Sequence, residues 1–141
     1  MSIENVVLFQ IDKTSKVSKL YSQREFDRLG MEITVEQWIL LKIIDENDGL
    51  TQKELAQQSL RDPASITRTL DLLSRKDFIE RKSVPDNRRQ YSICLKPAGK
   101  IFIEKYLPVV DSHRAKSIEG LSNKEVQQLN QLLIKIQQNL Q

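Results

Sequence analysis

The chain has 141 residues, of which 39% are hydrophobic and 29% are charged, with only four glycines and four prolines. This balance is typical of a globular, mostly helical protein. It is too apolar for a disordered chain and too often interrupted by charges for a membrane span. The formal net charge of +3 favours a polyanionic partner without requiring one.

Residues 4–29 carry apolar side chains at helical spacing and contain few helix breakers before Gly30. The spacing predicts one long N-terminal helix. The first five residues lack the basic region and the apolar run of a signal peptide, so we expect a cytoplasmic protein.

Three later helix starts are marked by capping boxes, in which a hydroxyl residue is followed three positions later by Glu or Gln. They begin at Thr34, Thr51 and Ser122. The first predicts a helix that ends at the turn-forming residues 47–49, and the second a short helix that ends near Gln58.

Asp62 and Pro63 supply an N-cap and a proline at the first helical position, which predicts a further helix to about Lys76. At about 100° per residue, its apolar side chains fall on one face and must pack inward. The opposite face is polar and basic, with Ser65 and Thr67 on its two flanks. The inward positions are Ile66, Leu70 and Leu73, and the outward positions are Ala64, Arg68, Asp71 and Arg75.

Residues 78–83 and 90–95 alternate between apolar and polar side chains and flank the charged segment 85–89, which predicts a β-hairpin. A helix then starts at Pro97 and contains Pro108. The last helix starts at Asn123 and carries an apolar stripe at three- and four-residue steps, which is typical of a packed helix pair. We favour an interface between subunits; the alternative is packing within one subunit. The stripe consists of Val126, Leu129, Leu133, Ile136 and Leu140.

The middle of the chain therefore reads helix, short helix, helix and hairpin, which is the order of a winged helix-turn-helix. The predicted fold class is mainly α with a small β-hairpin wing. Residues 33–96 are interpreted as the DNA-binding domain, and residues 1–32 and 97–141 as dimerisation helices.

Charge placement favours DNA as the partner of this middle segment. Residues 51–96 hold ten Lys and Arg against six Asp and Glu, an excess that accounts for the whole net charge. Arg68 is long enough to reach a guanine edge, an arginine at the hairpin tip can enter a minor groove, and the first amides after Thr51 can bind a phosphate. The alternative is a solvated helix face and a charged turn without a partner. The candidate DNA contacts are Thr51, Gln52, Lys53, Arg61, Ala64, Ser65, Thr67, Arg68, Arg75, Asp86, Arg88 and Arg89.

These residues resemble the MarR family of bacterial transcription regulators. The most specific matches are residues 62–68, the segment 86–89, which looks like the family's D-x-R-R wing signature, and residues 95–100. The resemblance implies a homodimeric repressor on a pseudo-palindromic operator of double-stranded DNA, with a small phenolic or anionic effector, or an oxidant, that releases the DNA. It also implies contacts from Ser65, Thr67 and Arg68, and a wing arginine, Arg88, whose neighbour Arg89 is held through Asp86 or the chain below.

Two positions depart from the family pattern. Asp77 stands where members often have Gly, so we expect it to adopt left-handed backbone geometry, which Asp tolerates better than most residues. Lys96 stands where a capping Thr is common, which weakens the start of the helix at Pro97.

Four aromatic residues suggest an effector pocket between the N-terminal helix and the DNA-binding core, with core packing as the competing interpretation. They are Tyr21, Phe26, Trp38 and Tyr106.

An enzyme is the first alternative to a regulator. It would need a nucleophile with a base, or a metal site, and the chain offers one histidine, His113, and one cysteine, Cys94. We expect no catalysis, no cofactor and no metal site, and we interpret Cys94 as a small core residue rather than a redox sensor. The second alternative is a winged-helix protein–protein interaction module without DNA binding.

Overall fold

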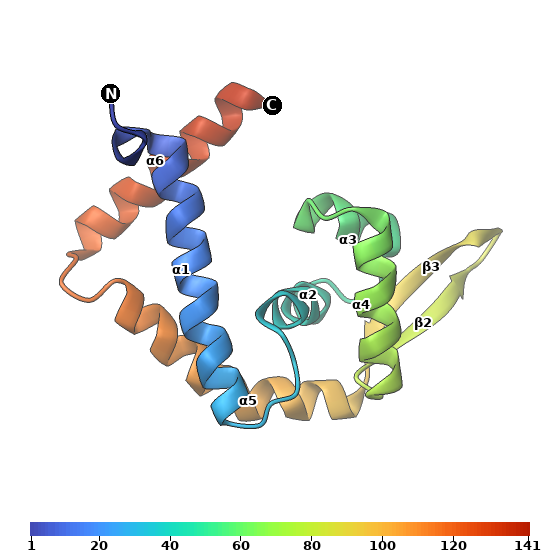
Figure 1. The fold of residues 1–141 in the computed structure, drawn as a ribbon. Coiled ribbons are helices and arrows are strands. Elements are labelled where there is room, and N and C mark those ends of the chain that lie inside the picture. Colours follow the sequence, from blue (N-terminus) through green and yellow to red (C-terminus); the bar gives the residue numbers. More distant parts are fainter. The chain divides into compact units, whose positions relative to one another are not determined.

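The computed structural model describes residues 1–141, apart from the side chain of Arg88. The fold is mainly α-helical with one small antiparallel sheet, as expected (Figure 1). Contacts divide the chain into two compact units, residues 1–108 and 109–141. The elements are η1 (Ile3–Asn5), α1 (Val7–Arg28), α2 (Val35–Glu46), β1 (Leu50–Thr51), α3 (Gln52–Ser59), α4 (Pro63–Arg75), β2 (Ile79–Val84), β3 (Asn87–Leu95), α5 (Pro97–Ser117) and α6 (Asn123–Leu140).

All three predicted capping boxes are confirmed. Thr34, Thr51 and Ser122 each accept a hydrogen bond at 3.1 Å from the amide three residues further on. In each case the Gln or Glu side chain at that position accepts a hydrogen bond in return from the cap residue's amide. Amides at a helix start lack partners within the helix, and each box satisfies two of them. Local sequence alone therefore determines where α2, α3 and α6 begin.

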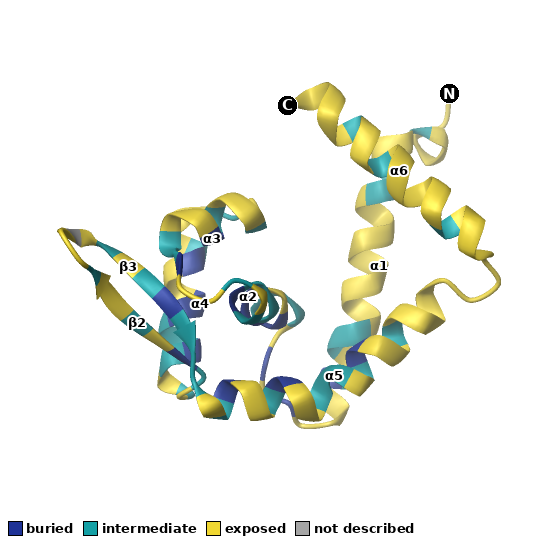
Figure 2. Ribbon diagram, turned by 180° about the vertical axis from the view of Figure 1, so that it is seen from behind, coloured by how far each residue is buried: buried dark blue, intermediate teal, exposed yellow. Residues whose placement is uncertain are grey.

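The core of the first unit lies between α2, α3, α4 and the sheet (Figure 2). The inward stripe predicted for α4 is confirmed, because Ile66, Leu70 and Leu73 are fully buried. Burying a side chain of this size stabilises a fold by about 1.5–3 kcal/mol. This packing fixes which face of α4 remains outside. Fully buried partners from the neighbouring elements include Leu40, Leu41, Ile44, Leu55 and Ile93.

The sheet has three strands in the order β1-β3-β2, whereas the sequence predicted two. The additional strand, β1, has only two residues and pairs Leu50 with Ile93. A strand of two residues is too short to show an alternating pattern in the sequence. Its strand conformation depends on its pairing with β3.

The hairpin turn is also tighter than predicted. Only Pro85 and Asp86 form the turn, and β3 begins at Asn87, so Arg88 and Arg89 belong to the strand rather than to the turn. Asp86 has a φ of 66°, the left-handed geometry that short hairpin turns require. A register shift between Ser83 and Val84 accommodates the change in pairing near the tip.

Left-handed backbone occurs at two positions that flank α4. Asp77 has a φ of 64°, which confirms the expectation for this residue. Leu60, in the turn between α3 and α4, has a φ of 54° and is 89% exposed. A left-handed conformation costs a residue with a Cβ roughly 1–2 kcal/mol. This geometry at Leu60 was not predicted from the sequence, since leucine is not a turn-forming residue.

Gly99, in the first turn of α5, allows the helix to approach the chain just before β2. A Cβ at this position would overlap the carbonyl oxygen of Phe78 and lie 2.9 Å from Leu95 Cδ1. The same carbonyl accepts a hydrogen bond at 2.8 Å from the amide of Lys96. Lys96 does not cap α5 with its side chain; its Nζ pairs with Asp77 at 2.5 Å.

In the second unit, the apolar stripe of α6 is only partly covered. Val126, Leu133 and Ile136 are half-buried, whereas Leu129 is 49% and Leu140 74% exposed. No described helix is both long enough and apolar enough to cross a membrane. The assignment of residues 1–32 and 97–141 to dimerisation remains a prediction.

Candidate nucleic-acid interface

The α4 helix is built so that one face must remain outside. Its N-cap, Asp62, accepts a hydrogen bond at 2.9 Å from the amide of Ser65, and Pro63 occupies the first turn. Ala64, Arg68 and Arg75 are exposed on the face opposite the buried stripe. Within the described part of the chain, neither arginine side chain has a hydrogen-bond or ion-pair partner. Both guanidinium groups are therefore available to an external anion or base edge.

The fourth outward residue of α4, Asp71, has a partner in the hairpin. Its Oδ1 accepts a hydrogen bond at 2.8 Å from Arg81 Nη2 on β2. Both side chains are partly buried, so this ion pair is less screened than a fully exposed one. The pair joins α4 to the wing. This ion pair was not predicted, because opposite charges ten residues apart on two different elements produce no periodic pattern in the sequence.

Ser65 and Arg61, both predicted to contact DNA, contact each other. Arg61 Nη2 donates to Ser65 Oγ and, at 3.3 Å, to Thr69 Oγ1. Arg61 Nη1 is buried and finds no partner among the described residues. Arg61 was predicted to contact DNA. In the structure its guanidinium is hydrogen-bonded to two side chains of α4.

Thr67, on the other flank of α4, is joined to α3. Its hydroxyl donates to the carbonyl oxygen of Pro63 at 3.0 Å and accepts from Gln52 Nε2 at 3.1 Å. The Thr51 hydroxyl is used in its capping box, whereas Lys53 is exposed and has no partner in the described part of the chain. At the start of α3, Lys53 and the first-turn amides therefore remain for a phosphate.

At the wing tip, Asn87 rather than Asp86 stabilises the local backbone. Asn87 Oδ1 accepts a hydrogen bond at 3.1 Å from the amide of Arg89. The Arg89 side chain is exposed, and no ion pair joins it to Asp86 among the described side chains. The side chain of Arg88 lies outside the described residues, so its predicted role as the wing arginine stays a prediction.

Three of the four aromatic residues proposed for an effector pocket belong to a contiguous aromatic cluster. The ring of Trp38 lies 6.3 Å from that of Phe26 and 6.2 Å from that of Phe102, which lies 4.9 Å from Tyr106. Phe26 and Trp38 are buried, Tyr106 is half-buried and Tyr21 is exposed. This arrangement favours the core-packing interpretation. Trp38 Nε1 is nevertheless buried without a partner among the described residues.

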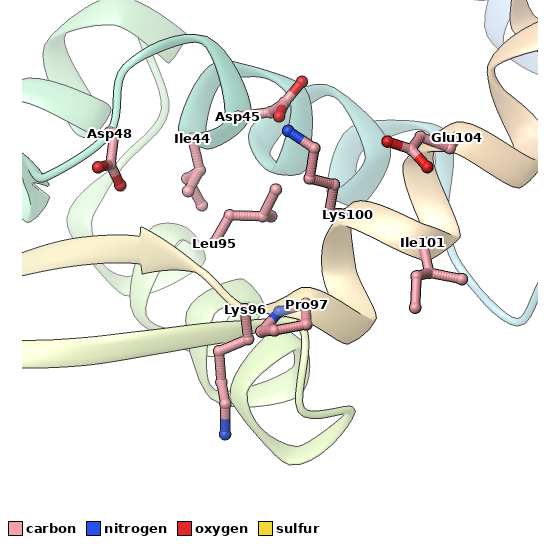
Figure 3. Close-up of a pocket in the computed structure, with 9 residues that line it drawn as sticks. All are labelled: Ile44, Asp45, Asp48, Leu95, Lys96, Pro97, Lys100, Ile101 and Glu104. Atoms are coloured by element: carbon pink, nitrogen blue, oxygen red, sulfur yellow. The ribbon is translucent and has the colours of Figure 1, made fainter.

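The largest of three pockets described in the first unit lies elsewhere, where the end of α2 faces the junction of β3 and α5. It has a volume of about 590 Å³ and is lined by nine residues, among them Asp45, Asp48, Lys100 and Glu104 (Figure 3). In Figure 3 the side chain of Lys100 points toward Asp45, whereas Lys96 points away. None of the predicted effector residues lines this pocket or the other two.

Cys94 and His113, the residues considered for catalysis or redox sensing, lie in different units of the chain. Cys94 is a half-buried free thiol in β3, and His113 lies in the second unit, in α5. Among the described residues, no group of three or more His, Cys, Asp and Glu is placed to hold a metal ion.

Comparison with known proteins finds similarity to one family. Residues 33–91 match the model of the MarR family. A MarR/EmrR family transcriptional regulator from Acinetobacter sp. ADP1 is 20% identical with a TM-score of 0.89, over 99% of this chain and 98% of that one. S. aureus MepR in complex with DNA is 25% identical with a TM-score of 0.84, over 99% and 100% of the two chains.

A third solved structure, Bordetella bronchiseptica BpsR, comes from work on the regulation of its DNA binding by 6-hydroxynicotinic acid. It is 16% identical to this chain with a TM-score of 0.86, over 97% of this chain and 96% of that one. The order of elements and the position of the wing are thus shared along nearly the whole chain. Residues 33–91, which hold the winged helix-turn-helix, are the part of the chain that matches the MarR family model.

Proposed function

We propose that this chain is a homodimeric, sequence-specific DNA-binding regulator of transcription that acts as a repressor. The observation that carries the proposal is the construction of α4, whose apolar side is buried while Arg68 and Arg75 stand exposed without internal partners. A helix with this division can enter a major groove while the core holds its other side. The DNA complex of the similar protein MepR supports the same partner here.

In the proposed complex, α4 reads base edges and its neighbours bind the backbone. Arg68 has the length and the planar donors to pair with guanine O6 and N7. Lys53 and the first amides of α3 bind a phosphate, and Arg88 and Arg89 on β3 approach the adjacent minor groove. Ala64 allows close approach because it has no side chain beyond Cβ.

The proposal that the chain forms a homodimer is supported by apolar side chains that the single chain leaves exposed. Leu129 and Leu140 on α6 are largely uncovered, as are Val17 and Leu20 on α1, which are both 59% exposed. Apolar patches of this kind mark surfaces that another protein covers. A twofold dimer would present two α4 helices to a pseudo-palindromic operator.

Fluorescence anisotropy across a range of salt concentrations tests the proposed function, with promoter DNA from the chain's own gene as the probe. If several Lys and Arg neutralise phosphates, the logarithm of the affinity falls with the logarithm of the salt concentration, with a slope of about −0.9 per phosphate. Light scattering on the same samples gives the stoichiometry. Absence of binding at low salt would favour the protein–protein interaction module instead.

We also propose that a small phenolic or anionic molecule releases the DNA. The proposal is supported by the indole N–H of Trp38, a buried donor without a described partner, on a ring that lies beside Phe26 and Phe102. An unsatisfied buried donor costs roughly 1–3 kcal/mol, which an acceptor on a ligand would recover. Because BpsR is regulated by 6-hydroxynicotinic acid, hydroxylated aromatic acids are suitable probes.

The chain has a single tryptophan, so its fluorescence reports on this site directly. Titration of 6-hydroxynicotinic acid and hydroxybenzoates should change the Trp38 emission and lower the affinity for DNA over the same concentration range. A loss of DNA affinity without any change in emission would move the effector site away from Trp38.

A further inference from the structure

Arg61 occupies an unusual place for a basic residue beside a DNA-reading helix. It precedes the N-cap of α4, and its Nη2 donates to the hydroxyls of Ser65 and Thr69, which lie one turn apart on the same flank. Its Nη1 is buried. Nη2 is thus occupied by the two hydroxyls and Nη1 is buried, so only Nε would remain for a direct contact with the DNA backbone.

A carboxylate on α2, Glu36, interacts electrostatically with Arg61 but is paired with a lysine. The pKa of Glu36 lies below its usual value, mainly because Lys19 Nζ on α1 donates to it at 2.7 Å, with further contributions from the positive charges of Lys19 and Arg61. The interaction with Arg61 is the smallest of these contributions, so the hydrogen bonds to Ser65 and Thr69 are the contacts that hold the guanidinium.

The partner of Ser65 determines whether the Ser65 hydroxyl donates or accepts. A guanidinium has donors only, so Ser65 Oγ must act as the acceptor in this bond. No described residue accepts the hydroxyl hydrogen of Ser65, and its amide is used by Asp62. The hydrogen is therefore left for an acceptor outside the chain.

Thr67 provides the contrast on the opposite flank. Its hydroxyl hydrogen is donated to the carbonyl oxygen of Pro63, and one of its lone pairs accepts from Gln52. What remains on Thr67 is one lone pair. Of the two flanking hydroxyls, only Ser65 still has a hydrogen to donate.

We propose that Arg61 is a positioning residue for operator recognition, which fixes Ser65 as a hydrogen-bond donor toward one base edge. The inference rests on the proposed function, because it needs α4 in the major groove. A donor at this place selects guanine O6 or N7, adenine N7 or thymine O4, and it disfavours the N4 amino group of cytosine. Arg61 thus determines base preference at one operator position without touching DNA.

The test is selection from an operator library randomised at each position, with wild type, Ser65→Ala and Arg61→Met. Ser65→Ala should reduce a preference of about three- to tenfold at one position to nearly none, which is the size expected for one hydrogen bond. Arg61→Met should lose the preference at the same position. In a double-mutant cycle, Arg61→Met should have little further effect once Ser65 is alanine.

Two further variants separate positioning from simple charge. Arg24→Met removes one exposed positive charge on α1 and should leave the preference unchanged. Arg61→Lys keeps the charge and much of the length but lacks the planar fork that reaches two hydroxyls, so it should relax the preference in part. Thermal melting of each variant confirms that the binding measurements are made on folded protein.

The salt dependence distinguishes the possible failures. A lower salt slope in Arg61→Met with unchanged base preference would show a phosphate contact and overturn the inference, as would a wild-type preference in Arg61→Lys. Independent, additive effects of the Arg61 and Ser65 variants would also overturn it. If wild-type protein binds no DNA at all, the proposed function itself has failed.

Discussion

Arg68 illustrates how a single residue acquires its role from its neighbours. The sequence placed it opposite the apolar stripe of α4, and the structure shows it exposed there and, among the described residues, without a partner. Asp71 was predicted on the same face, but it is engaged by Arg81. Arg68 and Asp71 were both predicted on the outward face of α4. A tertiary contact pairs Asp71 with Arg81, whereas Arg68 has no partner among the described residues.

For Arg68→Ala we expect specific binding to weaken by roughly 1–3 kcal/mol, with relaxed preference at one base position, because a bidentate contact to guanine is lost. Competition between operator and unrelated DNA measures both effects. Equal loss on all sequences would mean that Arg68 contacts a phosphate.

Leu60 gives a prediction about stability at the same scale. Replacing Leu60 by Gly relieves the left-handed strain and loses little apolar burial, since the side chain is 89% exposed. After the added entropy of the unfolded chain, the free energy of unfolding should rise by about 0.5–1 kcal/mol. Urea denaturation measures this change. A decrease would mean that the Leu60 side chain stabilises the turn in some other way.

At the scale of elements, the wing is positioned by contacts along β2 and at the base of the hairpin. The Arg81–Asp71 pair joins β2 to α4, and the contact between Gly99 and Phe78 joins the start of α5 to the base of β2. Strand β1 adds a third attachment through Leu50 and Ile93. The two wing strands are therefore held by contacts with three neighbouring elements, α4, α5 and β1.

The Gly99 contact is testable. Gly99→Ala should lower the free energy of unfolding by about 1–3 kcal/mol, because its methyl group would force α5 away from the Phe78 carbonyl. Thermal and urea unfolding measure the loss. The matched control is Lys100→Ala on the exposed side of the same turn, which should stay within about 0.5 kcal/mol of wild type. Equal stability of the two variants would contradict the role given to Gly99.

At the scale of the whole molecule, the single chain leaves many large apolar side chains exposed, several of them on α1 and α6. The three buried stripe residues of α4 have no counterpart on α6, where every position of the stripe is at least partly exposed. An amphipathic helix gains most of its stability from packing of its apolar face. A second copy of the chain is the partner that the proposed function requires.

Replacing both Leu129 and Leu133 by Asp should therefore convert the proposed dimer into a monomer. We expect affinity for a full operator to fall by roughly 10²-fold as two linked half-site contacts become one. Sedimentation and anisotropy on the same preparation measure the two effects. Gln131→Asp, on the other face of α6, is the control and should change neither quantity. A wild-type protein that is already monomeric would refute the dimer proposal.

The sequence by itself determined several features that depend on near neighbours along the chain. Capping boxes fixed three helix starts, Asp62 and Pro63 fixed a fourth, and apolar periodicity identified the buried face of α4. Such signals are readable because hydrogen bonds within one turn and the 3.6-residue repeat both act over a few residues. The left-handed turn at Asp77 belongs to the same class.

Only the tertiary structure decided which polar side chains of the proposed interface are free. The contacts of Gln52 with Thr67 and of Arg81 with Asp71 join residues that no local pattern relates. The pairing of β1 and the start of β3 at Asn87 were settled in the same way. A hydrogen bond between two elements depends on how their buried faces pack, and that packing is a property of the folded chain as a whole.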